Sequence, residues 1–388
     1  GISRDLEDMA ETGVGGAYLM PIGNSAALAS EENLTLADPP ADPLSDHWWD
    51  LVVFAVNEAG RLGLRLAMNA CDGWALAGGP WITPEMSMQE IVSTEQHIAG
   101  GIDFEGKLVQ PTTRHNYYRD IAVLAYPAPE GAEITSSSLR PKATTNISGL
   151  DPGPLVRGAD QAIQFPDEGW IQYEFNEPFT CRSIKMSPDQ RHYQLHRVKL
   201  SVSNDGKEFR SLGRLKPTQF QGWQDRGMGC THALEEVRAR FFRFEFDTTG
   251  TPDMSENTEG TKLRNRNRLG ASHIELSSRP AIEHWEGKSG YRWRRSEWTT
   301  EKECPTDLCV DAESIIDISQ NMDAEGVLRW TVPPGNWTIQ RIGFTTTGET
   351  NNPAGTGSGL ECDKFNPHAA RIQFEGWFGK ALDRVGPE

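Results

Sequence analysis

The chain has 388 residues, a length that predicts two or three domains at about 150 residues each. Hydrophobic residues make up 37% and charged residues 24%, which is typical of a globular protein with a buried core. Asp and Glu number 55 against 38 Lys and Arg, so the formal net charge is −17. This acidity excludes a protein that binds nucleic acid mainly by electrostatics. No apolar run approaches the roughly 20 residues of a membrane span.

The first 128 residues predict helices and strands in alternation. A helix over 3–12 ends at a glycine cluster over 13–16, and a short apolar strand follows over 17–21. A second helix begins at Ser45, with apolar residues at helical spacing, and the strand 64–69 comes after it. Helix, glycine and strand in succession are typical of a parallel α/β sheet or barrel.

From 129 to 278 the pattern is that of an all-β module. Short apolar strands over 170–175, 198–202 and 241–246 alternate with turn signals such as Asn-Asp-Gly at 204–206. This pattern predicts a β-sandwich of the jelly-roll type.

Residues 279–388 are predicted to continue the α/β domain, so the β module is expected to be an insertion into it. Two strands over 328–332 and 337–344 flank a tight turn. A helix is predicted over 367–382, with one apolar face that contains Ala370, Phe374, Trp377, Phe378 and Leu382.

A first candidate site lies in the glycine-rich segment 68–81, just after a predicted strand. Active sites of α/β folds gather at this end of the strands. Asn69 and Asp72 supply hydrogen-bonding groups, and Trp74 and Trp81 supply flat apolar surface. Polar groups beside aromatic rings suit a sugar, which has hydroxyls at its rim and C–H groups on its faces. The alternative is a glycine-rich loop folded over its own tryptophans.

A second candidate site is the sequence Gly-Ser-Gly-Leu-Glu-Cys-Asp-Lys at 357–364. Glu361 and Asp363 follow an apolar segment and precede a helix. Two nearby carboxylates can divide the roles of proton donor and ionised partner, as glycoside hydrolysis requires. The alternative is that Asp363 caps the following helix and Glu361 is solvated.

The six cysteines do not predict a disulfide scaffold. Cys304 with Cys309, and Cys181 with Cys230, are possible pairs, and buried or surface thiols are the alternative. No Cys and His spacing in the sequence suggests a zinc site.

These segments resemble glycoside hydrolase family 106, the α-L-rhamnosidases. The resemblance rests on Gly-Gly-Pro-Trp-Ile-Thr-Pro at 78–84, Tyr-Arg-Asp-Ile-Ala-Val-Leu at 118–124, Val-Pro-Pro-Gly-Asn-Trp-Thr-Ile at 332–339 and the Glu361 segment. The β module resembles galactose-binding-like discoidin domains through Trp-Ile-Gln-Tyr at 170–173 and Ser-Asn-Asp-Gly-Lys-Glu-Phe at 203–209.

The resemblance implies the first part of a (β/α)₈ TIM-type barrel, over 1–128 and 279–388, interrupted by the β-sandwich at 129–278. It implies inverting cleavage of terminal α-L-rhamnose with Glu361 as general acid, assisted by Ca²⁺. The sugar contacts would be Asn69, Asp72, Trp74, Trp81 and Asp363. Family members run far longer, so the partner carboxylate and the calcium ligands are expected beyond residue 388, and the protein is expected to be periplasmic or secreted.

Two other functions fit the same residues. One is a non-catalytic carbohydrate-binding protein, which would hold a glycan without cleaving it. In the other, the β module is a structural spacer, a role favoured by the lack of an aromatic platform in its sequence. Nothing in the sequence indicates an oligomeric state.

Overall fold

The computed structural model divides the chain into two compact units, residues 1–127 with 314–388 (unit 1) and residues 128–313 (unit 2). The two units are described separately. The described residues are 1–21, 41–73, 77–128, 133–159, 163–165, 168–188, 198–215, 219–220, 229–247, 269–289, 294–295, 308–351 and 354–386.

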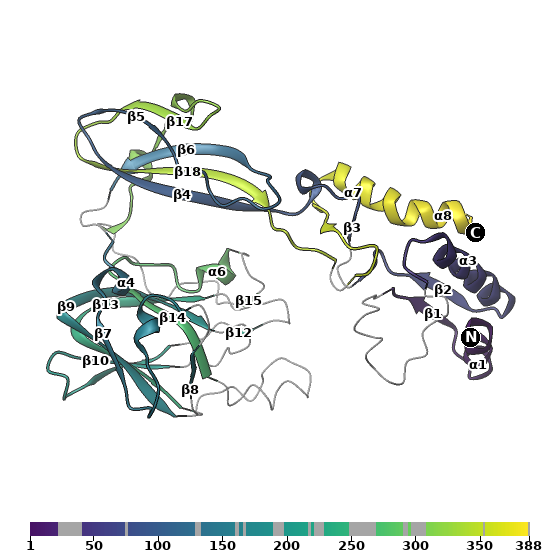
Figure 1. Cartoon of the computed structure of the whole chain (residues 1–388), viewed down its shortest axis with the longest axis horizontal. Coiled ribbons are helices and arrows are strands. Elements are labelled where there is room, and N and C mark those ends of the chain that lie inside the picture. Colours follow the sequence, from purple (N-terminus) through teal and green to yellow (C-terminus); the bar gives the residue numbers. More distant parts are fainter. Residues whose placement is uncertain are drawn as a thin grey trace. The chain divides into compact units, whose positions relative to one another are not determined.

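Unit 1 begins with the predicted α/β pattern (Figure 1). Helix α1 (Ile2–Glu11) and strand β1 (Gly16–Leu19) come first, and α3 (Asp46–Arg61) leads to β2 (Arg65–Met68). Strands β1 and β2 pair in parallel. The predicted start of α3 is confirmed, because the Ser45 side chain accepts a hydrogen bond from Trp48 N at 3.2 Å.

The stretch 89–127 is antiparallel β-structure, and the expectation of further alternating helices and strands is wrong there. Strands β4 (Gln89–Ala99), β6 (Arg119–Pro127), β16 (Ile316–Asp317) and β18 (Asn336–Thr346) pair in the order β16-β6-β18-β4 among the described strands. The pairing joins Gln89 to Thr346 and Ala99 to Asn336. Because these partners are so distant in sequence, local periodicity does not reveal their pairing.

The two strands predicted around the turn at 333–335 are confirmed, but they pair with other strands. Strand β17 (Val327–Thr331) pairs with β5 (Asp103–Lys107), and β18 lies between β4 and β6. The core of this part of unit 1 contains Leu108, Val123, Ala125, Ile318, Leu328, Val332, Trp337 and Ile339.

An ion pair between a buried arginine and a partly exposed aspartate lies at the edge of this core. Arg341 on β18 donates from Nε to Asp120 Oδ1 at 2.7 Å and from Nη2 to Asp120 Oδ2 at 2.8 Å. The Arg341 side chain is 6% exposed, whereas that of Asp120 is 36% exposed. The hydrogen bonds from Arg341 lower the pKa of Asp120 below its ordinary value, although partial burial opposes this shift.

Unit 2 is built on one continuous antiparallel sheet whose described strands run in the order β11-β10-β13-β9-β14-β8, with β7 also paired to β9. The strands are β7 (Lys142–Thr145), β8 (Ile163–Phe165), β9 (Gly169–Pro188), β10 (Lys199–Ser203), β11 (Arg210–Arg214), β13 (Cys230–Phe246) and β14 (Leu269–Ser277). Short helices α4 (Ser136–Leu139) and α6 (Trp285–Lys288) and the pair β12 (Gln219–Phe220) and β15 (Arg294–Arg295) complete it.

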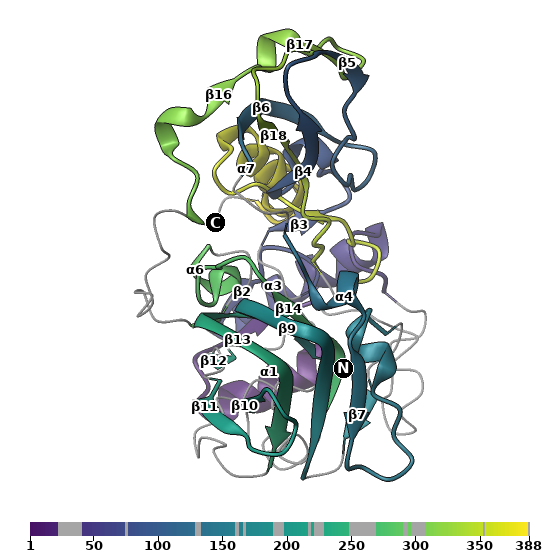
Figure 2. The ribbon, with the colours of Figure 1, turned by 90° about the vertical axis from the view of Figure 1, so that its left-hand side faces the viewer.

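The long strands β9 and β13 run side by side (Figure 2) and carry register shifts. In β9 the buried apolar side chains of the core are at odd positions up to Cys181 and at even positions from Ile184. In β13 the same change occurs between Ala239 and Phe242. Each irregularity keeps the apolar side chains in one core where a regular strand would turn them outward. The all-β prediction is therefore confirmed, with the described strands hydrogen-bonded into one continuous sheet, and the jelly-roll arrangement of two packed sheets stays a prediction.

The contacts within the chain give one domain boundary next to the predicted one and a second boundary away from the predicted one. The contacts divide the chain between 127 and 128, and they place 279–313 in unit 2, although the sequence analysis assigns these residues to the α/β domain. Within the described ranges, no helix is both long and apolar enough to cross a membrane.

Candidate functional site

Both candidate segments of the sequence meet in unit 1. Strand β3 (Gly78–Gly79) pairs with β19 (Leu360–Glu361), which places Gly78 opposite Glu361. The Glu361 backbone is held on both sides, because its N–H donates to Glu349 O and its carbonyl accepts from Met88 N, each at 2.9 Å. Glu361 therefore stands on a fixed backbone, as a catalytic side chain requires.

Glycines allow the two segments to approach this closely. A Cβ on Gly359 would lie 2.0 Å from the carbonyl carbon of Gly79, and one on Gly357 would lie 2.6 Å from Asp72 Cβ. A Cβ on Gly376 would lie 2.3 Å from the Trp81 ring. Only glycine fits such contacts, so the glycine-rich composition has a packing cause.

Asn351 is the buried centre of this packing. Its Nδ2 donates to the carbonyl of Asp72 at 2.6 Å and to that of Gly357 at 2.8 Å. Its Oδ1 accepts from Gly359 N at 2.8 Å. One amide thus satisfies backbone groups of both candidate segments. The only sequence signal for Asn351 is its place in a glycine- and asparagine-rich loop, which does not distinguish it from its neighbours.

Asp72 and Asn69 bond to the loop itself. Asp72 is fully buried, and its Oδ2 accepts from Gly355 N at 2.9 Å and from Gly357 N at 3.1 Å. Asn69 Nδ2 donates to the carbonyl of Gly73 at 3.0 Å. These contacts give both side chains a role in shaping the loop.

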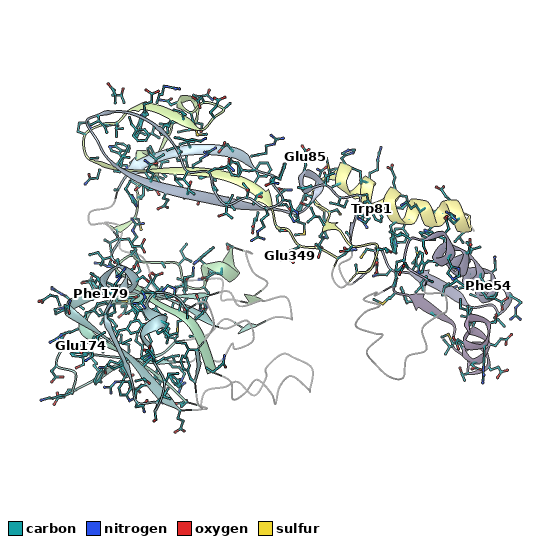
Figure 3. All side chains as sticks on the ribbon, in the orientation of Figure 1. Phe54, Trp81, Glu85, Glu174, Phe179 and Glu349 are labelled. Carbon is teal, nitrogen blue, oxygen red and sulfur yellow. The ribbon has the colours of Figure 1, made fainter. Side chains whose placement is uncertain are left out.

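Trp81 packs against the C-terminal helix (Figure 3). Its Nε1 donates to Gln373 Oε1 at 2.9 Å, and Lys380 Nζ lies 5.2 Å from the ring centroid. Gln373 Nε2 in turn donates to Ala70 O at 3.1 Å. Trp377 Nε1 donates to Asn69 O at 2.7 Å. Trp81 therefore contacts side chains of the C-terminal helix. Trp74 lies outside the described residues.

The C-terminal helix differs from its prediction in the face that it buries. It consists of α7 (Pro367–Phe374), a π-helical turn (Glu375–Gly379) and α8 (Lys380–Val385). Ala369, Gln373 and Trp377 are buried, whereas Phe374 and Leu382 are about half exposed. The predicted burial of Trp377 is confirmed. The burial of Gln373 was not predicted, because the prediction used apolar residues alone, whereas the Gln373 amide is buried through its hydrogen bond to Ala70 O.

Glu361 and Asp363 have different surroundings. Glu361 Oε1 accepts from Lys364 Nζ at 2.5 Å, and the Glu361 side chain is 20% exposed. Asp363 Oδ1 accepts from Phe365 N at 2.9 Å, and the following helix is capped by Asn366, which accepts from His368 N. The helix cap is therefore Asn366, and the alternative that Asp363 caps this helix is wrong.

Glu349 and Cys71 are two further groups close to Glu361. The backbone bridge between Thr350 and Leu360 puts Glu349 directly across from Glu361 on the neighbouring segment, and Glu349 is exposed. On the buried side lies the Cys71 thiol, whose pKa burial raises to about 11, with the negative charges of Asp72 and Glu361 adding to the effect. Cys71 is therefore a protonated, inert thiol at neutral pH.

Among the described residues of this site, no three His, Cys, Asp or Glu side chains lie close enough together to share a metal ion. Calcium takes six to eight oxygen ligands. Throughout the described ranges, one group of three or more His, Cys, Asp or Glu side chains is close enough to share a metal, and it consists of Cys230, His232 and His284 in unit 2. Its nitrogen and sulfur atoms do not suit calcium, so no step involving calcium is derived.

The chain is similar in sequence and structure to known proteins. The family model of alpha-L-rhamnosidase, glycoside hydrolase family 106, matches residues 1–388. A rhamnosidase from Novosphingobium sp. PP1Y is similar in structure, with a TM-score of 0.72 and 26% identity over 100% of this chain and 35% of that one. A protein of Formosa agariphila named "Putative beta-glucuronidase" is 26% identical over 390 residues, which are 100% of this chain and 20% of that protein.

The chain therefore spans about a third of the solved rhamnosidase and a fifth of the Formosa protein. The match to the family model extends through the β module as well as both parts of unit 1. The chain belongs to glycoside hydrolase family 106, the α-L-rhamnosidases.

Proposed function

We propose that this chain is part of an enzyme that removes terminal α-L-rhamnose from glycans or glycosides with inversion, and that Glu361 is its general acid. The observation that carries the proposal is the placement of Glu361. It is a partly exposed carboxylate on a backbone bonded on both sides, within a segment typical of the family.

In this mechanism the Glu361 carboxyl protonates the glycosidic oxygen as the bond to the anomeric carbon breaks. A second carboxylate removes a proton from water, which attacks from the opposite face. Inversion needs the two carboxyl groups about 6.5–9.5 Å apart, which leaves room for that water. Since this chain covers 35% of the similar rhamnosidase, we expect the partner carboxylate in the remaining part of that fold.

The other predicted site residues have supporting roles in the proposal. Asn69 and Asp72 bond to backbone groups of the loops next to Glu361, and Trp81 bonds to Gln373 of the C-terminal helix. In the proposal these three residues support the backbone that carries Glu361. Asp363 and Trp74 stay candidate sugar contacts. An incomplete TIM-type barrel, with β1, α3 and β2 as its first repeat, also stays a proposal, supported by the parallel pairing of β1 and β2.

Two properties are proposed from the family alone. Calcium would assist catalysis through ligands outside the described residues. The protein would be periplasmic or secreted, because the glycans it acts on lie outside the cell.

The test is rhamnose release by the full-length protein and its Glu361→Gln variant, from 4-nitrophenyl α-L-rhamnoside and from an unactivated rhamnoside. Loss of a general acid lowers turnover by about 10²- to 10⁴-fold, and the loss should be smaller for the nitrophenyl substrate, whose leaving group needs little protonation. Glu375→Gln is the matched control, because Glu375 is exposed on the C-terminal helix.

Equal losses on both substrates would contradict the role of general acid, and unchanged turnover would remove Glu361 from the mechanism. Saturable rhamnoside binding without any release by the wild-type protein would favour the carbohydrate-binding alternative.

A further inference from the structure

Unit 2 contains a buried cluster of one cysteine and two histidines that the rhamnosidase proposal does not use. Cys230 and His232 lie at the start of β13, and His284 immediately precedes α6. One candidate ligand atom from each lies within 4.8 Å of the others. Cys230 is 0%, His232 1% and His284 6% exposed.

The backbone brings the three side chains together. Cys230 and His232 are two residues apart on a strand, so their side chains leave it on the same face. His284 N donates to Thr231 O at 2.9 Å, which joins the segment before α6 to the strand between the other two residues. Thr231 also bonds to Glu286, from Oγ1 to Oε1 at 2.6 Å and from N to Oε2 at 3.2 Å.

His284 adopts a backbone conformation that favours glycine. Its φ is +53°, in the left-handed region, which is uncommon for a residue with a side chain. Such conformations persist where the surroundings hold them, and they are concentrated at ligand sites.

A carboxylate lies behind both histidines. Glu283 Oε1 is 3.0 Å from His284 Nε2 and 3.6 Å from His232 Nδ1, and Glu283 Oε2 accepts from Ala233 N. Metal-bound histidines usually direct their second nitrogen to such a carboxylate, which fixes the ring orientation.

We propose that Cys230, His232 and His284 form a structural zinc site in unit 2. The ligand set is one thiolate and two imidazoles, with a water molecule as the fourth ligand, while the Glu283 carboxylate orients the two histidine rings. Tetrahedral zinc has bonds of about 2.3 Å to sulfur and 2.0–2.1 Å to nitrogen, so a contraction of the cluster by about 1 Å brings all three atoms into range. Thiolate and imidazole ligands select zinc over calcium or magnesium.

The burial of the cluster separates this role from a catalytic one. A nucleophilic cysteine must meet its substrate, and reactive cysteines are partly exposed, whereas Cys230 and His232 are buried. Zinc would fasten the segment before α6 to β13.

The first experiment measures metal in the full chain, purified from cells supplied with zinc, by mass spectrometry of the acidified protein. About one zinc per chain is expected, and Cys230→Ser and His284→Gln should each lower the zinc content at least tenfold. Cys181→Ser and His273→Gln are matched controls in the same unit, because these residues lie outside the cluster, and both variants should keep the metal.

The second experiment needs no variant to fold. Cobalt is exchanged into the wild-type protein, where a thiolate and two imidazoles in tetrahedral geometry give visible d–d bands and a sulfur-to-cobalt charge-transfer band. Removal of zinc should also lower the midpoint of thermal unfolding of unit 2.

A folded wild-type protein that contains no zinc, takes up none on titration and shows no thiolate band with cobalt would overturn the proposal. So would zinc that Cys230→Ser retains in a folded protein, or stoichiometric copper in place of zinc. These readouts do not involve rhamnoside hydrolysis, so they stand or fall separately from the role of Glu361.

Discussion

Asn351 provides a direct test of how the candidate site is held together. Replacement by Ala removes three hydrogen bonds of 2.6–2.8 Å to backbone groups of Asp72, Gly357 and Gly359. Each such bond contributes about 1 kcal/mol net, and a buried partner left without one costs about 1–3 kcal/mol. With a small cavity added, we expect Asn351→Ala to lower the local free energy of unfolding by about 3–5 kcal/mol.

The assay is hydrogen exchange with peptide resolution, because a chain of two units need not unfold in one step. At 1.4 kcal/mol per tenfold, amides in peptides over 349–363 should exchange about 10²- to 10³-fold faster, up to the limit set by global unfolding. Asn336→Ala is the control, since Asn336 is exposed at the start of β18, and its effect should stay within about 0.5 kcal/mol.

Unchanged protection of 349–363 in Asn351→Ala would refute the reasoning. It would mean that the glycine contacts hold the loop closed without the amide. Asn351→Asp separates the two contributions, because it keeps the shape of the side chain and replaces the donor by an acceptor. It should be at least as destabilising as Ala.

Two further predictions concern unit 1. Gly359→Ala should open the paired loops, because its Cβ would lie 2.0 Å from the carbonyl carbon of Gly79, and limited proteolysis should then cut this region. Gly379→Ala is the contrasting change, because its Cβ would lie 3.6 Å from Phe374 O, an ordinary van der Waals distance. It should raise the free energy of unfolding by about 0.4–1 kcal/mol. Asp120→Asn should destabilise at pH 7 by about 1–3 kcal/mol, a value reduced from that of a fully buried pair because Asp120 is partly exposed. Since its folded pKa is lowered, Asp120 stabilises above the unfolded pKa of about 3.9, and this contribution is lost as the pH falls through the folded pKa. Urea unfolding should therefore separate wild type from Asp120→Asn at pH 7, the gap should narrow as the pH falls below about 3.9, and a constant gap would contradict the ion pair with Arg341.

The glycine-rich loop shows what motifs can and cannot predict. The motifs at 78–84 and 357–364 identified the family, and the structure pairs these two segments as β3 and β19. The motifs did not predict which polar residues of the 68–81 and 357–364 segments face solvent. Asp72 is fully buried, where its carboxylate accepts from Gly355 N and Gly357 N, which lie far along the chain, whereas Glu361 is partly exposed.

Local order was readable from the sequence wherever neighbouring residues decide it. Ser45 and the apolar spacing after it are sufficient to begin α3, and the turn signals of 129–278 are sufficient for a β module. Non-local order was not readable. Three features join residues that lie far apart in the sequence. They are the pairing of β4 with β18, the bond of Gln373 to Ala70, and the contact of His284 with Cys230 and His232. Periodicity reports only which face of a segment is apolar, whereas tertiary packing decides which distant segment that face meets and which polar groups are enclosed with it.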